Sequence, residues 1–268
     1  MKTYLYQIEA VSNLHVGSGE INQGVVDNLV QRDPLTQFPM INASSLKGAL
    51  RQHFNEYRKD IVNYIFGNPI KNGGNENKDN KAGAFRFFDA RMLSIPVRSD
   101  ERLYFMATCP QILKDYYDML TLCGINNNAY KCLFNVEAGM SPIVCRSEFS
   151  GAVIEDMNKV AKNDEHKDFS NIVGSPSVLL EDKDFRKLCD DNHLPVIARN
   201  YLDNGESKNL WYEQVVPRLS KLYFVVMTPD DDKDKFNIFN EIITSKLVQI
   251  GGNASVGNGL CRIVNINI

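Results

Sequence analysis

Four glycines fall within nine residues near the C-terminal end of the chain, and this stretch constrains the fold more than any other part of the sequence. Residues 251–259 read GGNASVGNG, and their bare backbone N–H groups let an anion or a neighbouring backbone approach closely. Apolar residues precede the stretch at helical spacing as far as Leu247 and Ile250, and a short strand, residues 260–268, follows it. The pattern predicts a helix, a glycine loop and a terminal strand.

From the residues alone, this glycine loop has two interpretations. It is either a cradle for an anion or a helix C-cap followed by a tight turn. It lacks the Gly-Lys-Ser/Thr ending of a P-loop, and it follows a helix, whereas a Rossmann fingerprint precedes one. Neither of these two nucleotide-binding motifs is therefore present here.

Length and composition limit the classes of protein to which this chain can belong. A chain of 268 residues and 30.4 kDa can bury a full core, and we expect one domain, residues 1–268, with insertions, although two domains also fit this length. The six cysteines show no C-x-x-C spacing, and no apolar leader precedes Tyr4, so we expect reduced thiols in a cytoplasmic protein. No apolar run approaches the roughly 20 residues that cross a bilayer, so we expect a soluble protein without a membrane partner.

The net charge of −3 is unevenly distributed. Between Gly151 and His193, ten acidic residues stand against six basic ones, a balance of −4 that leaves +1 for the rest of the chain. Nucleic-acid-binding proteins usually have a basic balance. The chain is therefore not strongly basic, but its composition permits a local basic groove.

Apolar periodicity predicts the order strand, helix, strand, strand, helix, insertion, strand, helix, strand. Helices packed against an antiparallel sheet in this order favour an α+β, ferredoxin-like architecture. We expect the first helix to start with Ser44 as its N-cap and to run to Ile61. The other expected elements are strands at residues 3–11, 84–95, 102–108 and 221–227, a helix that begins at Pro110, and a final helix with acidic residues 230–234 at its start.

Two segments depart from this periodicity. Residues 71–82 are rich in Asn and Gly and have no apolar residue before Ala82, which predicts a flexible surface loop. Residues 124–216 lose a clear period, and we expect an insertion there that includes an extended hairpin.

Few side chains stand out as candidates for chemistry. Lys47 and Arg51 lie one turn apart on the first helix, and this stripe is either a solvated face or part of a site for a polyanion. Asp27 is a lone carboxylate on a long irregular loop, and His15 is a single histidine between apolar neighbours. Spacing alone favours structural roles for both residues. The sequence contains no Ser-His-Asp order, H-E-x-x-H motif or kinase motif set.

Several segments resemble the motifs of RAMP proteins, the repeat-associated subunits of CRISPR effector complexes. These segments are residues 14–19 (LHVGSG), 26–33 (VDNLVQRD), 44–51 (SSLKGALR) and 251–260 (GGNASVGNGL). Within that superfamily, residues 88–93 (FDARML), 96–99 (PVRS), 194–200 (LPVIARN) and 210–217 (LWYEQVVP) resemble the RNA-cleaving backbone subunit of the type III-B (Cmr) complex. The matches extend over nearly the whole chain, apart from the loop at residues 71–82 and the acidic segment.

The resemblance implies an RNA-recognition-motif-like core with a protruding thumb hairpin. It implies that copies of the protein stack into a helical filament along a CRISPR RNA, next to other Cmr-complex subunits. Each copy would hold one segment of the guide and cut the paired target RNA once in that segment. Contacts to guide phosphates would fix the register without reading sequence. The resemblance assigns such contacts to Ser44, Lys47, Arg51, Gly251, Gly252, Asn253, Gly257 and Gly259.

The resemblance also assigns cleavage of the target strand to Asp27. Its carboxylate would either bind Mg²⁺ or another divalent metal transiently, or help to deprotonate the ribose 2′-OH for attack on the adjacent phosphate. His15 and Glu213 lie in motifs associated with the same neighbourhood and are further candidate catalytic residues. The family often has a second acid beside Glu213, whereas this chain has Gln214.

Two other hypotheses stay open. The chain could be a catalytically silent RNA-binding backbone subunit. It could also be a stand-alone RAMP endoribonuclease that processes CRISPR RNA precursors, commonly with a histidine. The motifs at residues 88–99 favour the RNA-cleaving backbone subunit over the stand-alone enzyme.

Overall fold

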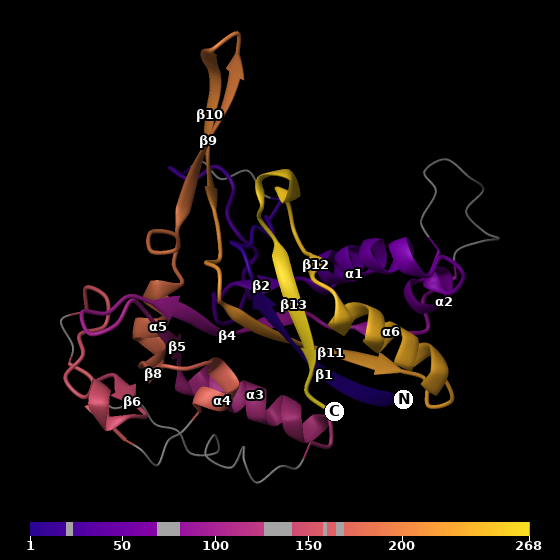
Figure 1. Ribbon diagram of the computed structural model, residues 1–268, viewed down its shortest axis with the longest axis horizontal. Coiled ribbons are helices and arrows are strands. Elements are labelled where there is room, and N and C mark those ends of the chain that lie inside the picture. The colour runs from indigo at the N-terminus through magenta and orange to yellow at the C-terminus, as the bar shows by residue number, and fades with distance from the viewer. Residues whose placement is uncertain (20–23, 69–80, 126–140, 158–159, 165–168, 268) are drawn as a thin grey trace.

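The computed structural model describes residues 1–19, 24–68, 81–125, 141–157, 160–164 and 169–267 (Figure 1). The loop expected at residues 71–82 lies outside these residues, apart from its last two. Residues 126–140 of the expected insertion also lie outside them.

The centre of the fold is an antiparallel sheet with the strand order β13, β1, β11, β4. The bounds are Lys2–Ala10 for β1, Ala90–Val97 for β4, Lys221–Thr228 for β11 and Leu260–Asn265 for β13. Helix α1 (Ala43–Tyr57) lies between β1 and β4 in the chain, and helix α6 (Lys233–Ser245) lies between β11 and β13. Each helix-linked pair of strands encloses one strand of the other pair. The two βαβ units therefore interleave, as the ferredoxin-like prediction requires.

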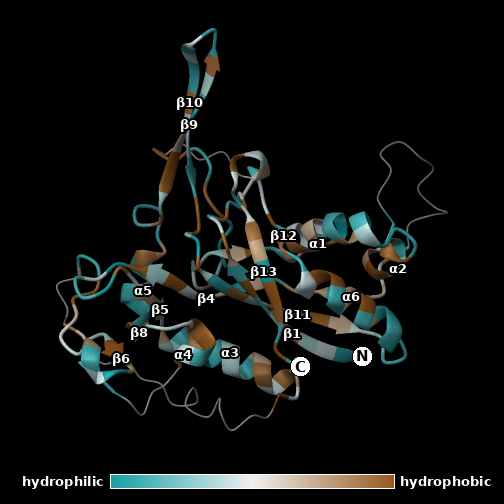
Figure 2. Ribbon diagram, in the orientation of Figure 1, coloured by the Kyte–Doolittle hydropathy of each residue, from teal (hydrophilic) through white to brown (hydrophobic). Residues whose placement is uncertain are grey.

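Helices cover both faces of this sheet. Successive residues of a strand point to opposite faces. In β1, the Tyr6 hydroxyl donates to Asn240 of α6 at 3.0 Å, while the neighbouring Gln7 amide donates to Tyr116 of α3 (Pro110–Leu122) at 3.4 Å. Helix α1 packs beside α6 through Phe54, whose ring lies 6.2 Å from that of Phe239. Hydrophobic side chains accordingly fill the layers between sheet and helices. Figure 2 shows hydrophobic positions along the strands and helices of this core.

The sheet continues beyond this core on both sides. On the β4 side it adds β5 (Phe105–Thr108), β8 (Ser177–Leu179), β6 (Ile143–Val144) and β7 (Lys162–Asn163), and β12 (Val248–Gln249) pairs with β13 at the opposite edge. The smaller elements are β2 (Met40–Ile41), β3 (Arg86–Phe87), α2 (Val62–Phe66), α4 (Ser170–Val173), α5 (Asp182–Leu188) and the 3₁₀ turns η2 (Ser147–Phe149) and η3 (Ala254–Val256). Part of the expected insertion is thus joined to the main sheet through the parallel pairing of β5 and β8.

A two-stranded hairpin projects from this body (Figure 1). It consists of β9 (Val196–Asp203) and β10 (Glu206–Gln214). Asn204 and Gly205 at its tip have φ values of 51° and 85°. Two consecutive positive φ values are typical of a type I′ turn, which Asn-Gly favours. The hairpin lies within the segment where an extended hairpin was expected.

The first helix differs in its ends from the prediction. Ser44 is not its N-cap, because α1 begins at Ala43 and Asn42 occupies the cap position without a side-chain hydrogen bond. Instead, Asp89 accepts a hydrogen bond from the Ala43 N–H at 2.7 Å. The helix ends at Tyr57 rather than at Ile61, which is the N-cap of α2.

The last helix is shorter than predicted. It ends at Ser245 and does not extend to Ile250, because residues 248–249 pair with Cys261 and Leu260 as strand β12. This pairing satisfies backbone groups and buries Val248 completely. The glycine stretch therefore joins two strands, and the prediction of a helix that runs directly into it is wrong.

Two further findings concern the cysteines and the lengths of the helices. The five cysteines within the described ranges are free thiols, and Cys132 lies outside them. Among the described residues, none of the helices has the length and apolar character needed to span a membrane.

Candidate functional site

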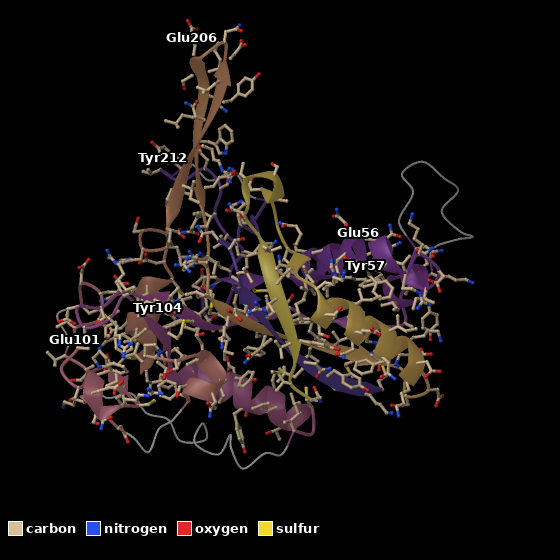
Figure 3. All side chains as sticks on the ribbon, in the orientation of Figure 1. Glu56, Tyr57, Glu101, Tyr104, Glu206 and Tyr212 are labelled. Carbon is tan, nitrogen blue, oxygen red and sulfur yellow. The ribbon has the colours of Figure 1, made fainter. Side chains whose placement is uncertain are left out.

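The base of strand β10, residues 212–214, brings three separate parts of the chain together. Its backbone holds the loop that carries Asp27 and also contacts His15, while one of its side chains contacts Asn253 in the glycine loop. Figure 3 labels Tyr212 where the projecting hairpin joins the body. Residues that are nearly 240 positions apart in sequence thus form one site.

Asp27 is exposed and oriented by backbone contacts. Its Oδ2 accepts a hydrogen bond from the Tyr212 N–H at 2.7 Å. The N–H groups of Asp27 and Asn28 both donate to the Tyr212 carbonyl at 3.1 Å, and the Gln214 N–H donates to the Asn28 carbonyl at 2.9 Å. Oδ1 has no hydrogen-bond partner among the described residues. One carboxylate oxygen is therefore fixed and the other is available to a ligand.

His15 is nearly buried, with 8% of its surface exposed. Its Nδ1 lies 2.6 Å from the Gln214 carbonyl oxygen. Because that oxygen can only accept, Nδ1 carries a proton and Nε2 is the ring nitrogen left for a ligand. A Cβ at Gly17 would lie 3.2 Å from Nε2, so the missing side chain leaves this nitrogen open.

Glu213 is 6% exposed and has a donor on each carboxylate oxygen. Its Oε1 accepts from Trp211 Nε1 at 2.9 Å, and its Oε2 accepts from Arg199 Nε at 3.0 Å and from Asn253 Nδ2 at 2.7 Å. Burial raises the pKa of Glu213, but the hydrogen bonds from Trp211 and Arg199 and the charges of His15 and Arg199 outweigh it. The net pKa of Glu213 is lowered, so its carboxylate is ionised at neutral pH.

The glycine loop is accessible, but fewer of its amides are free than predicted. Residues 251–257 are exposed except for the half-buried Asn253. The amides of residues 252 and 256–259 already donate to backbone carbonyl groups, so the expected run of bare N–H groups is wrong for these positions. Gly251 packs its backbone against the His15 carbonyl, which accepts from the Gly252 N–H at 2.8 Å. The amides of Asn253, Ala254 and Ser255 have no acceptor among the described residues.

The two cations of the stripe on α1 differ in their surroundings. Arg51 donates to the Gly67 carbonyl and to Asn63 Oδ1, the latter at 2.7 Å, and so ties α1 to α2. Lys47 is half-buried and forms no ion pair with any described residue. Ser44 is exposed at the second position of the helix. The stripe therefore offers Lys47 as an available cation and uses Arg51 internally.

A cavity of about 320 Å³ lies between the His15 segment, the hairpin base and the glycine loop. It is lined by His15, Gly17, Ser18, Gly19, Asn28, Leu29, Glu213, Gly252 and Asn253. The site thus has a hollow next to the Asp27 segment, to which the hairpin base, the His15 segment and the glycine loop all contribute.

Comparison with known proteins places this arrangement in a family. Residues 7–262 match the profile of the RAMP superfamily. The chain belongs to the RAMP superfamily. It is 28% identical over 287 residues to the CRISPR system Cmr endoribonuclease Cmr4 of Pyrococcus furiosus, covering 98% of this chain and 95% of that relative. It is 26% identical over 306 residues to the CRISPR system CMR subunit Cmr4 of Saccharolobus solfataricus, covering 97% and 95%.

Solved structures show the same RAMP fold. A chain in the cryo-EM structure of the type III-B Cmr-beta complex bound to cognate target RNA has a TM-score of 0.81 at 24% identity, covering 100% of this chain and 98% of that one. Oligomeric Cmr4 from Pyrococcus furiosus has a TM-score of 0.73 at 24% identity, covering 99% and 98%.

Sequence analysis did not predict how two residues, Gln214 and Arg199, build the site of this RAMP protein. Gln214 is fully buried, and its Oε1 accepts from the Val30 N–H at 3.3 Å and from an Arg32 NH2 group at 3.2 Å. An amide at this position therefore anchors the loop that follows Asp27. Arg199 lies opposite Trp211 in the hairpin. The Asn-Gly turn at the tip alone would pair Arg199 with Leu210, but a register shift between Ser207 and Asn209 moves the pairing by one residue, and no sequence signal indicated that shift.

Proposed function

We propose that this protein is a backbone subunit of a type III-B CRISPR (Cmr) effector complex, which binds CRISPR RNA and cleaves complementary target RNA. The near-complete match to a Cmr4 endoribonuclease supports this function, and matches to an RNA-bound Cmr complex and to oligomeric Cmr4 support partners of the same kinds. The observation that carries the proposal is the oriented, accessible carboxylate of Asp27 at the hairpin base. The assembly acts in the cytoplasm, where its RNA target is met.

The guide strand is held by contacts that do not read its bases. Lys47 supplies a cation, and the free amides of the glycine loop supply neutral donors to phosphate oxygens. One subunit needs only a short groove, because neighbouring copies in a filament hold the rest of the guide. A net charge of −3 is compatible with this division of the RNA among subunits.

Asp27 and His15 supply the proton transfers. The free Asp27 oxygen accepts the proton of a ribose 2′-OH as that oxygen attacks the adjacent phosphate. His15, once protonated at Nε2, donates a proton to the departing 5′-oxygen, and its tautomer is set by the Gln214 carbonyl. The backbone of β10 positions both groups.

A divalent metal fits this site only in a limited way. Among the described residues, no three His, Cys, Asp or Glu side chains gather as metal ligands. Mg²⁺ commonly takes one or two carboxylates together with substrate phosphates and waters. In the alternative to proton transfer, the free Asp27 oxygen would hold such an ion with the RNA phosphate, and the ion would neutralise charge at the scissile linkage.

The hairpin supplies the distortion that in-line attack requires. An A-form strand holds each 2′-OH poorly aligned with the next phosphate, so the nucleotide at the cut must leave helical geometry. Tyr201 and Leu210 of the hairpin are 59% and 53% exposed and offer apolar surface for stacking against displaced bases.

Cleavage by the guide-loaded complex tests the proposal. A complementary RNA is incubated with the assembled complex and Mg²⁺, and fragments are measured over time. Asp27→Ala should lower the cleavage rate by about 100-fold or more, as loss of a general base does, while target affinity stays within about twofold. Asp156→Ala removes a fully exposed carboxylate elsewhere and should leave cleavage unchanged.

The other outcomes identify the alternative functions. Intact target RNA after incubation with the wild-type complex would indicate a silent backbone subunit. Cleavage of repeat RNA by the isolated protein would indicate a stand-alone processing enzyme.

A further inference from the structure

Glu213 links the hairpin to the glycine loop through hydrogen bonds. Within the hairpin it accepts from Arg199 on β9 and from Trp211 on β10. Across the site it accepts from Asn253, which has a left-handed backbone with φ 65°. The Asn253 side chain is thereby held by a carboxylate 40 residues earlier in the chain.

The same contacts argue against a proton-transfer role for Glu213. A general base needs a free oxygen and a pKa near the working pH. Both Glu213 oxygens already have donors, and the net pKa of Glu213 is lowered. Asp27, in contrast, has a free oxygen and is exposed.

We infer that Glu213 is a positioning residue, which acts through Asn253 to set the glycine loop relative to the hairpin and to Asp27. This inference rests on the proposed function, because the glycine loop holds the guide and the hairpin meets the target. The bond fixes where the guide phosphates lie relative to the cleaving carboxylate. Small displacements of a reacting strand lower rates strongly, about 100-fold for roughly 1 Å.

The backbone contacts of β10 do not replace this link. Asp27 and His15 are held by backbone atoms of residues 212–214, so they keep their places when the Glu213 side chain changes. The glycine loop has its own backbone bond to the His15 carbonyl, from Gly252. Loss of the Glu213 link should therefore loosen residues 253–257 without releasing Asp27.

A double-mutant cycle in the guide-loaded complex tests the inference. Glu213→Gln and Asn253→Ala are made singly and together, and both the rate and the lengths of the target fragments are measured. We expect each single variant to slow cleavage about tenfold. We also expect a broader distribution of fragment lengths, because the target is then also cut at nucleotides next to the normal site. The double variant should be no slower than the slower single variant, because both changes act on the same bond: Asn253→Ala removes its donor, and Glu213→Gln removes the charge of its acceptor.

Two controls show whether a loss of cleavage comes from lost positioning, from unfolding of the variant or from failure of the proposed function. Glu155→Gln changes another carboxylate that accepts from an arginine side chain, Arg98, and should leave the rate and the fragment lengths unchanged. Unfolding curves of all variants show whether they are folded. The wild-type complex must cleave in the same assay, so absence of wild-type cleavage would contradict the proposed function and not this inference.

Specific results would overturn the positioning role. If Glu213→Gln abolished cleavage as Asp27→Ala does while Asn253→Ala had no effect, Glu213 would act on the substrate directly. Additive losses in the double variant with unbroadened fragment lengths would also contradict a role through Asn253.

Discussion

At the scale of single residues, two glycines of the glycine loop share a backbone conformation but have different surroundings. Gly251 has φ 82° and Gly257 has φ 84°. A Cβ at Gly251 would lie 2.2 Å from the His15 carbonyl oxygen, whereas a Cβ at Gly257 would meet no atom within 4 Å. At position 251, glycine is required both by the positive φ and by the close approach of the His15 carbonyl oxygen. At position 257, only the positive φ favours glycine.

Alanine at these two positions should therefore have unequal effects. Gly257→Ala should lower the free energy of unfolding by about 1 kcal/mol, because it places a side chain in the left-handed region. Gly251→Ala should lower it by about 1–3 kcal/mol more, because the loop must move away from His15. Urea unfolding of both variants measures the difference. Equal losses would show that the contact with His15 does not constrain the loop.

Glu213 gives the stability of the protein a defined pH dependence. The folded pKa is lowered, so the folded carboxylate contributes stability above its unfolded pKa of about 4.3, and this contribution is lost as the pH falls through the folded pKa. The difference in unfolding free energy between the wild type and Glu213→Gln should be largest at neutral pH. It should shrink below about pH 4.3. A difference that stays constant from pH 7 to pH 3 would contradict an ionised, hydrogen-bonded Glu213.

At the scale of elements, the cap of helix α1 comes from a residue distant in sequence. Asp89→Ala removes the acceptor for the Ala43 N–H and should lower the free energy of unfolding by about 1 kcal/mol. Ser44→Ala changes the residue that the sequence pattern indicates as the cap, yet it should stay within about 0.5 kcal/mol of the wild type. Thermal and urea unfolding of the pair measure both values. A larger loss for Ser44→Ala would show that the serine caps the helix in solution.

Local pattern predicted the elements better than it predicted their ends. The strands β1 and β11 and the helix that begins at Pro110 are confirmed, because their periodicity is local. The predicted N-cap of α1 and the predicted end of α6 were wrong. These ends depend on contacts with Asp89 and with strand β13, which are distant in sequence. For the same reason, the sequence indicated individual site residues through family motifs but not the bonds that join them.

The hairpin can be shortened without disturbing the site. Asn200 pairs with Leu210, so residues 201–209 can be replaced by Asn-Gly while the strands keep their register. Every residue removed is exposed, so the free energy of unfolding should change by no more than about 0.5 kcal/mol. We expect the shortened complex to bind target RNA but to cleave it at least about tenfold more slowly, because the displaced nucleotide loses its support. Full cleavage by this variant would exclude a role for the hairpin tip in opening the duplex.

At the scale of the whole molecule, the sheet order places the chain ends of the core side by side. Strands β1 and β13 are antiparallel neighbours, and residues 6–10 pair with residues 261–265. The loops that leave β1 and enter β13 therefore emerge at one edge of the sheet. His15 follows the first strand and the glycine loop precedes the last, which explains why two sequence-distant motifs meet below the hairpin.

Overall charge does not explain RNA binding by such a molecule, and a pair of matched variants can show this. Lys47→Glu and Lys114→Glu each change the net charge from −3 by two units, but Lys47 lies on α1 and Lys114 lies on α3, which covers the opposite face of the sheet. We expect Lys47→Glu to weaken guide binding about tenfold and to reduce the salt dependence by about one phosphate contact. The loss should be equal for guides of unrelated sequence, because phosphate contacts do not read bases. Lys114→Glu should bind guide RNA like the wild type, and equal losses for the two variants would mean that total charge, not a local groove, holds the guide.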